Sequence, residues 1–217
     1  MSRPRKDFWN DVETSPEDIQ RGTTNRQKVL AKLINHALFS EPLNPKVVAQ
    51  WHKECLSGLS YVAEEDQCLL GAYRGTSHPR LVRMRVGVGS RAGVEPHDVK
   101  GELASFFERL EKQIEVLTSK IDLDADKPQE ELHQIAQVAG WAHGEWVRIH
   151  PFANGSGRTA RLIANWVLVR FRLLPVVGIR PRPEQPYEPA AVASMSGDHS
   201  KITQFIIALL EDPSNRA

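Results

Sequence analysis

Residues 150–161 read HPFANGSGRTAR and lie between two stretches with helical hydrophobic periodicity. The helical pattern of residues 130–149 stops before this segment and resumes over residues 158–171. Gly155 and Gly157 let backbone N–H groups converge in the loop, and the helix that follows presents the positive end of its dipole. The segment therefore predicts an anion site, such as a phosphate site, between two core helices.

The charged side chains of the same segment favour phosphate chemistry. Arg158 and Arg161 are three residues apart on the second helix, so both guanidinium groups can reach one region. His150 stands at the entrance of the loop as a titratable base. A glycine-rich helix start is often only a turn, and paired arginines are often a solvated face. Their occurrence together within twelve residues favours a site that binds phosphates and moves a proton.

The segment resembles the Fic (filamentation induced by cAMP) motif, His-Pro-Phe-x-(Asp/Glu)-Gly-Asn-Gly-Arg-x-x-Arg. Flanking features extend the resemblance over about residues 60–211: Gly71-Ala72-Tyr73-Arg74, a basic hairpin, Trp146-Val147-Arg148-Ile149, Tyr187, Gly197-Asp198, Ile202 and Phe205. It implies a mainly α fold, a Fic-like helical core with one short β-hairpin flap. It also implies a protein adenylyltransferase that moves AMP from ATP to a Ser, Thr or Tyr hydroxyl of a target protein.

The resemblance gives each loop residue an expected role. His150 would be the general base that deprotonates the attacking hydroxyl. The residues that it assigns to the nucleotide are Asn154, Gly155, Ser156, Gly157, Arg158, Arg161 and Tyr187. The three residues 155–157 would line the anion hole for the α-phosphate, the two arginines would bind the β- and γ-phosphates, and the tyrosine would pack near adenine. Phe152 is expected to point into the core and anchor the loop.

Two positions depart from the motif. Asn154 stands where the family usually has the acid that binds Mg²⁺, and an amide oxygen is a poorer ligand for a hard cation than a carboxylate. Ser156 replaces the motif Asn but keeps the backbone N–H, and its hydroxyl is a smaller donor for an anion. ATP is therefore the expected substrate, Mg²⁺ the expected cofactor with Asn154 as its weakened ligand, and the activity is expected to be reduced.

Arginines at positions 80, 83, 85 and 91 mark a basic hairpin over residues 71–93. The resemblance identifies Arg83, Met84, Arg85 and Val86 as the flap that binds the target protein through an extended segment. A nucleic-acid surface would interleave aromatic residues with the arginines, and none is present here. No nucleic-acid partner is expected.

The remaining periodicity divides the chain into three parts. Residues 1–22 lack a sustained apolar period and predict an N-terminal arm, in which Phe8 and Trp9 could pack. Residues 23–59 predict two helices that pack on the core, the first capped by Thr23 and the second following Pro45. Residues 60–217 form the Fic-like domain. Further helices are expected after Asp98, over residues 130–149 and over residues 201–211.

Composition narrows the classes of protein. The chain has 217 residues, with 28 Lys and Arg against 27 Asp and Glu, and 41% of its residues are hydrophobic. These values are ordinary for a globular domain and exclude a chain that is disordered throughout. Cys55 and Cys68 lack metal-site or redox-motif spacing, which favours a reducing compartment. With no long apolar run, we expect a soluble cytoplasmic protein without a membrane partner.

Regulation and catalytic competence stay open at the level of sequence. Many family members carry an inhibitory helix with the motif Ser/Thr-x-x-x-Glu. Residues 23–27 are nearest to this motif in position but end in Gln27 instead of Glu. Residues 60–64 match the motif but lie in a different region of the chain from the inhibitory helix. A separate inhibitory partner protein is therefore one possibility, and no inhibition is another. The alternative functions are a catalytically weak nucleotide-binding or interaction module of Fic fold, or transfer of another phosphate-containing group.

Overall fold

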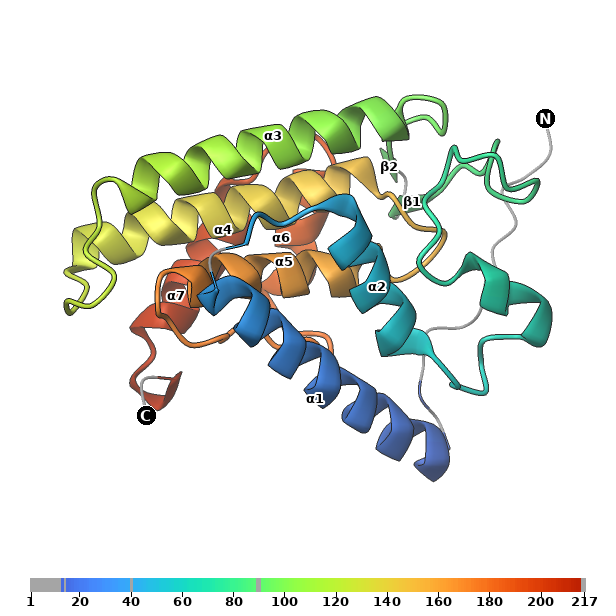
Figure 1. Cartoon of the computed structure of the whole chain (residues 1–217), viewed down its shortest axis with the longest axis horizontal. Helices are drawn as coiled ribbons and strands as arrows, with labels where there is room; N and C mark the ends of the chain where they lie inside the picture. The colour runs from blue at the N-terminus through green and yellow to red at the C-terminus, as the bar shows by residue number, and fades with distance from the viewer. Residues whose placement is uncertain (1–12, 14, 40, 89–90, 216–217) are drawn as a thin grey trace.

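The computed structural model describes residues 13, 15–39, 41–88 and 91–215, and this part of the chain is mainly α-helical (Figure 1). The helices are α1 (Pro16–Leu38), α2 (Pro45–Leu56), η1 (Glu64–Leu69), α3 (Val99–Thr118), α4 (Gln129–Ile149), α5 (Ser156–Arg170), α6 (Tyr187–Ser194), α7 (Ser200–Glu211) and η2 (Pro213–Asn215). Strands β1 (Gly87–Val88) and β2 (Arg91–Ala92) pair antiparallel. The expected class, a helical core with a short hairpin, is confirmed.

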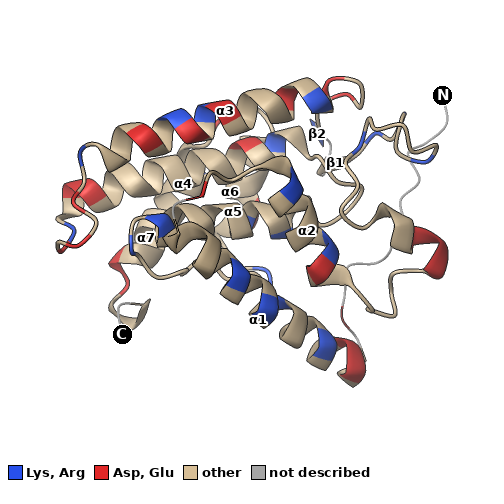
Figure 2. Ribbon diagram, in the orientation of Figure 1, with Lys and Arg blue, Asp and Glu red and all other residues tan. Residues whose placement is uncertain are grey.

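Helices α4 and α5 form the centre of the fold. Helix α4 packs against α3, α5, α6 and α7, while α1 and α2 pack on α5 (Figure 1). Trp146 of α4 and Trp166 of α5 are both 2% exposed or less, and Trp51 of α2 joins the same core. Charged residues of both signs follow α3 along its length, whereas α5 carries few (Figure 2). The motif loop, residues 150–155, joins the two most central helices.

Helix α1 begins at Pro16, so the prediction that residues 1–22 form an arm and that Thr23 caps the helix is wrong for residues 16–22. The Oγ of Ser15 accepts the N–H of Asp18 at 3.0 Å, and proline is favoured in the first helical turn. The first turns of α1 are polar and the apolar periodicity begins only after them, so the sequence pattern did not indicate this start. Phe8 and Trp9 lie outside the described residues.

The hairpin is shorter than the predicted span of residues 71–93. Gly87 pairs with Ala92 and Val88 with Arg91, and the N–H of Gly93 donates to the carbonyl of Val86 at 3.0 Å. The preceding segment folds as turns around Leu81, which is fully buried in a small cluster with residues of α2 and η1. Leu81 is therefore buried by a series of turns and not by an extended strand.

Helix α6 was not expected, because its sequence follows a proline-rich stretch. The segment between α5 and α6 is held by Asn165, whose side chain bonds both the N–H and the carbonyl of Val177, at 2.9 and 2.8 Å. A short 3₁₀ or α-helical segment can begin after a proline.

None of the described helices has the length and apolar character needed to cross a bilayer.

An ionic network joins α3, α4 and the start of α7. Arg148 bonds both Glu145 oxygens, at 2.8 and 2.9 Å, and also pairs with Glu102. His199 Nε2 lies 3.2 Å from Glu145. Burial would raise the pKa of Glu145, but the hydrogen bonds from His199 and Arg148 lower it to about 2. The network fixes the C-terminal half of α4, which carries the motif loop.

Gly140 permits the close contact between α4 and α7. A Cβ at this position would lie 2.7 Å from the Cα of Thr203, a backbone atom that moves only with α7. We expect Gly140→Ala to destabilise the protein by about 1–3 kcal/mol, the usual range for overpacking. Urea denaturation measures the change.

Gly101 in α3 provides the matched control. A Cβ there meets nothing within 4 Å, so Gly101→Ala should stabilise the protein by about 0.5–1 kcal/mol through helix propensity. Equal denaturation midpoints for the two variants would show that α4 and α7 are not in close contact at residue 140.

Candidate functional site

His150 ends α4 in a left-handed conformation, with φ 50° and ψ 59°. Its backbone N–H still donates to the carbonyl of Trp146 at 3.0 Å. A left-handed conformation is unfavourable for a residue with a Cβ, so surrounding contacts must hold it. The chain turns sharply here, and His150 is half-buried.

Arg74 supplies those contacts, and its side chain is 1% exposed. Its Nε donates to the carbonyl of His150 at 2.7 Å, and Nη2 donates to the carbonyl of Ile149 at 3.0 Å. The same guanidinium reaches the carbonyls of Met84 and Val94, at 2.8 and 2.9 Å. Arg74 therefore joins the end of α4 to both sides of the flap.

Gly93 allows the flap to lie directly against His150. A Cβ on Gly93 would lie 2.8 Å from the Cβ of His150 and 3.4 Å from Nη2 of Arg74. On the opposite side, the backbone N–H of Arg74 donates to Pro151 at 2.8 Å, and Tyr73 forms an isolated β-bridge with Phe152. The flap and the motif loop are thus a single hydrogen-bonded unit.

The environment of His150 favours the neutral imidazole. Burial, followed by the charge of Arg74, lowers the pKa of His150 to about 4, although the carbonyl of Val147 acts in the opposite direction. Nδ1 lies 3.3 Å from that carbonyl, which can only accept, so Nδ1 carries the proton. Nε2 is then the nitrogen with a lone pair, the form that a general base needs.

Gly155 turns the chain into α5 with φ 81°, in the left-handed region that favours glycine. The first N–H that bonds within the helix is that of Thr159, which donates to Gly155 at 3.0 Å. The N–H groups of residues 156–158 precede it at the positive end of the helix dipole, and the first turn contains no acid. This arrangement can bind an anion.

Phe152 anchors the loop, as expected, and is fully buried. Its ring stacks on His52 with centroids 3.9 Å apart and on Tyr73 with centroids 4.6 Å apart. Trp146 Nε1 donates to Thr159 Oγ1 at 2.8 Å and ties α4 directly to the first turn of α5. Aromatic packing and this bond therefore hold the two ends of the loop together.

The side chains at the two positions that depart from the motif both accept hydrogen bonds from backbone N–H groups within the loop. Asn154 Oδ1 accepts the N–H of Gly155 at 2.5 Å. Ser156 is 1% exposed, and its Oγ accepts the N–H of Phe152 at 3.1 Å. The hydroxyl of Ser156, expected to reach an anion, instead closes the turn, which leaves the backbone N–H for that purpose.

A preformed Mg²⁺ site does not fit these residues. Within the described part of the chain, no group of three or more His, Cys, Asp or Glu side chains is placed to hold a metal ion. The amide oxygen of Asn154, the expected ligand, already accepts a backbone hydrogen bond. Mg²⁺ prefers an octahedron of oxygens that includes carboxylates or phosphates, and the loop offers no carboxylate in the expected position.

Both motif arginines are buried at the start of α5, with Arg158 3% and Arg161 5% exposed. A Cβ on Gly157 would lie 3.6 Å from Nη1 of Arg161, so this guanidinium lies beside the first turn. Arg161 also donates to the hydroxyl of Tyr187 at 2.8 Å and to the carbonyl of Ile179 at 2.9 Å. The fold brings the loop, Arg161 and Tyr187 together.

Tyr187 lies inside the protein and is 3% exposed. Its hydroxyl bonds Arg161 and lies 3.0 Å from Nε2 of His143, while its ring packs edge-on against Phe205. Through these contacts Tyr187 holds the guanidinium of Arg161 in place. His143 is fully buried.

The flap residues 83–86 lie in the irregular segment before β1. Met84 and Val86 give their carbonyls to Arg74 and Gly93, as described above, which fixes the base of the flap. Arg83 is exposed, and Arg85 pairs with Glu95 at 2.9 Å on the surface. The side of the flap that faces solvent therefore presents Arg83 and the ion pair between Arg85 and Glu95.

Two residues with a large structural effect on the site were missed from the sequence. Arg74 was part of the resemblance but had no assigned role, and His52 had no signal at all. A single histidine on an amphipathic helix is ordinary, and nothing local indicates that it contacts a loop 102 residues away.

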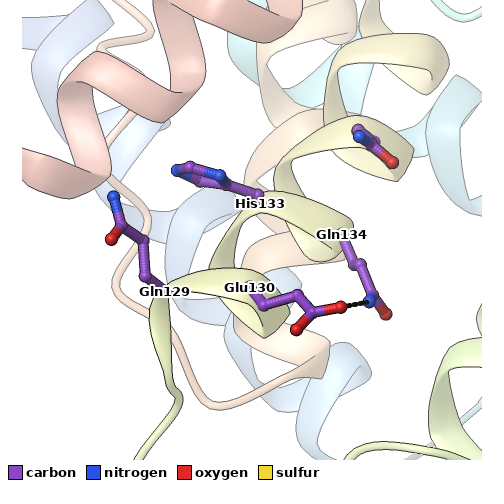
Figure 3. Close-up of a pocket in the computed structure, with 5 residues that line it drawn as sticks. Gln129, Glu130, His133 and Gln134 are labelled. Atoms are coloured by element: carbon purple, nitrogen blue, oxygen red, sulfur yellow. Dashed lines mark hydrogen bonds between the residues drawn. The ribbon is translucent and has the colours of Figure 1, made fainter.

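A polar hollow at the opposite end of α4 is unrelated to this site. It is lined by Gln129, Glu130, His133, Gln134 and Gln137 (Figure 3). Gln134 donates to Glu130 at 3.5 Å within it. His133 precedes His150 by 17 residues, or about 25 Å along the helix. The hollow contributes no residue to the motif loop.

The chain is similar to known proteins in sequence and in fold. The model of the Fic/DOC family matches residues 42–168. A curated relative from Nematostella vectensis, named protein adenylyltransferase Fic, is 36% identical over 104 residues, which cover 48% of this chain and 23% of that protein. One from Drosophila persimilis with the same name is 30% identical over 124 residues, 57% of this chain and 21% of that protein. The chain thus spans less than a quarter of the length of these relatives.

A solved structure with a similar fold is BepC, a VirB-translocated effector protein from Bartonella tribocorum with bound AMPPNP. It superposes with a TM-score of 0.59 at 15% identity, over 91% of this chain and 88% of that one. At this identity the likeness concerns the fold.

Two histidines with lowered pKa values make the stability dependent on pH. Burial, then the charges of Arg161 and His199, lowers the pKa of His143 from its ordinary value of 6.5 to about 3, and that of His150 is also lowered. The unfolded chain therefore binds protons below about pH 6.5 that the folded chain does not bind. We expect the free energy of unfolding to fall as the pH drops from about 6.5 to about 4.5, with His143 contributing roughly 1.4 kcal/mol per pH unit.

Urea denaturation across this pH range, on the parent and on His143→Leu, measures the slope. The variant should show a shallower slope whatever its absolute stability, because it lacks one titrating group. Parallel slopes would mean that residue 143 is not buried in the neutral form.

Proposed function

We propose that this chain, which belongs to the Fic/DOC family, transfers AMP from ATP to a Ser, Thr or Tyr hydroxyl of a target protein. The observation that carries the proposal is the juxtaposition of a neutral base with an anion-binding helix start. His150 and the first turn of α5 are six residues apart and are held in one unit by Arg74, Phe152 and Thr159. The names of the curated relatives, and AMPPNP bound to a protein of similar fold, support ATP as the nucleotide.

In the proposed step, Nε2 of His150 takes the proton of the target hydroxyl as its oxygen attacks the α-phosphorus. The new bond joins that oxygen to the α-phosphorus, the bond to the oxygen between the α- and β-phosphates breaks, and pyrophosphate leaves. Of the three residues expected to line the anion hole, Gly155 already donates its N–H to Asn154, so the N–H groups of Ser156 and Gly157 stabilise the charge on the α-phosphate. Arg158 and Arg161 neutralise the outer phosphates. Transfer of this kind depends chiefly on positioning and charge, which the loop provides.

Several features of the partners belong to the same proposal. The solvent face of the flap, residues 83–86, receives the target segment. Mg²⁺ enters with the phosphates of the nucleotide, because the loop lacks the carboxylate of the family motif. The free thiols of Cys55 and Cys68 favour the cytoplasm as the compartment, and inhibition, where it occurs, comes from a separate partner protein.

A second candidate function is a nucleotide-binding module of weak or no activity. The bond between Asn154 Oδ1 and the N–H of Gly155 favours it, since the metal-ligand position is occupied within the loop. Incubation with ATP labelled on either the α- or the γ-phosphate, followed by intact-mass analysis of candidate targets, separates the two functions. An AMP-sized adduct carrying the α-label supports transfer, whereas ATP binding without an adduct supports the module. A γ-labelled adduct would mean that another phosphate group is moved.

His150→Ala should abolish labelling of the target and leave the affinity for ATP within about threefold of the parent value. The histidine acts on the hydroxyl and contributes little to holding the phosphates, whereas general-base catalysis typically supplies a factor of about 10²–10⁴. Labelling rate and nucleotide affinity are measured on the same preparation. Undiminished labelling by the variant would remove His150 from the mechanism.

Asn154→Asp should lower the Mg²⁺ concentration needed for half-maximal labelling and raise the rate. An Asp oxygen can still accept the N–H of Gly155, so the turn is retained, while the second oxygen becomes available to the metal. Mg²⁺ titrations of labelling and of ATP binding provide the measurement. If the titrations of variant and parent overlay, residue 154 does not face the metal.

A further inference from the structure

His52 of α2 packs directly against the motif loop. It is 2% exposed, and its ring lies flat on Phe152, with 14° between the ring planes. Nε2 lies 2.8 Å from the carbonyl oxygen of Asn154, and the backbone N–H of Gly71 donates to Nδ1 at 2.9 Å. One side chain thus contacts both the loop and the segment that leads to Arg74.

The two partners of His52 determine its tautomer. A backbone N–H can only donate, so Nδ1 must carry a lone pair towards Gly71. A carbonyl oxygen can only accept, so Nε2 must carry the proton that bonds Asn154. The imidazole is therefore neutral and protonated on Nε2, because a second proton on Nδ1 would face the N–H of Gly71.

The bond to Asn154 acts at the position where the anion site begins. Asn154 is followed by Gly155, the left-handed residue that starts α5. A Cβ on Gly155 would lie 2.9 Å from Nε2 of His52, so the loop closes directly on the imidazole. The peptide plane between these two loop residues is held on one side by His52 and on the other by the Asn154 side chain, which accepts the N–H of Gly155. Its orientation sets the direction of the N–H groups in the first turn.

We propose that His52 is a positioning residue for the nucleotide: its Nε2–H holds the carbonyl of Asn154, so that the first-turn N–H groups of α5 converge on a phosphate. This inference rests on the proposed function of the site. His52 itself touches no nucleotide. The ring stack on Phe152 and the bond to Gly71 fix the position of the imidazole. Through its bond to Asn154, the fixed imidazole then holds the orientation of the loop backbone.

Two amide substitutions at position 52 each keep one of these two hydrogen bonds and remove the other. Gln places its side-chain N–H near the position of Nε2 and keeps the donor to Asn154, but it loses the acceptor for Gly71. Asn places its oxygen near the position of Nδ1 and keeps the acceptor for Gly71, but it loses the donor to Asn154. Each variant lacks the ring stack and one hydrogen bond, so the two should be destabilised by similar amounts in urea denaturation.

Affinity for ATP, measured by titration calorimetry on the whole chain, should distinguish the two variants. We expect His52→Gln to bind ATP within about threefold of the parent and His52→Asn to bind roughly tenfold more weakly, the usual effect of a lost buried hydrogen bond. Equal affinities for the two variants, at equal stability, would overturn the positioning role. A loss confined to His52→Gln would overturn it as well.

The tautomer provides a test that does not depend on nucleotide transfer. In a long-range ¹H–¹⁵N spectrum of the labelled parent chain, His52 should show a protonated Nε2 and an unprotonated Nδ1. The opposite tautomer would overturn the inference. If the tautomer and the affinity pattern are found but no AMP is transferred, the proposed function fails and the role of His52 in positioning stands. Absence of ATP binding by the parent would overturn both.

Discussion

The buried guanidinium of Arg74 holds four backbone carbonyls that belong to three parts of the chain. Those of Ile149 and His150 end α4, that of Met84 lies before β1, and that of Val94 follows β2. A buried charge without partners would be strongly destabilising, and here the polarised carbonyls compensate for lost hydration. Burial lowers the pKa of Arg74 to about 10, so the group stays protonated at neutral pH. The left-handed turn at His150 depends on these bonds.

Two left-handed residues, His150 and Gly155, reverse the chain between two central helices. Because the turn is so short, the C-terminal end of α4 and the N-terminal end of α5 lie side by side. A base at the first and the N–H groups of the first helical turn at the second are then brought to one place. The geometry needs close packing beneath it, which Phe152 provides between His52 and Tyr73.

The departures at Asn154 and Ser156 change the chemistry of the loop and preserve its shape. Both side chains bond backbone N–H groups within the loop, those of Gly155 and Phe152. An anion site built from backbone N–H groups survives such changes, since those donors belong to every residue type except proline. A metal site does not survive them in the same way, because it depends on the particular oxygens that a side chain supplies.

The sequence by itself determined the helical class, most helix positions and the loop that carries the motif, since Pro151, Gly155 and the apolar periods around them act within a few residues. It also indicated that His150 ends the helix before the loop and that Arg161 lies on the helix after it. Only the tertiary structure decided that Tyr187 supports Arg161, that Leu81 shortens the hairpin, and that His52 and Arg74 hold the loop from segments 102 and 76 residues away. Local conformational preference is encoded in neighbouring residues, whereas a hydrogen bond between distant segments exists only after packing has brought their backbones together.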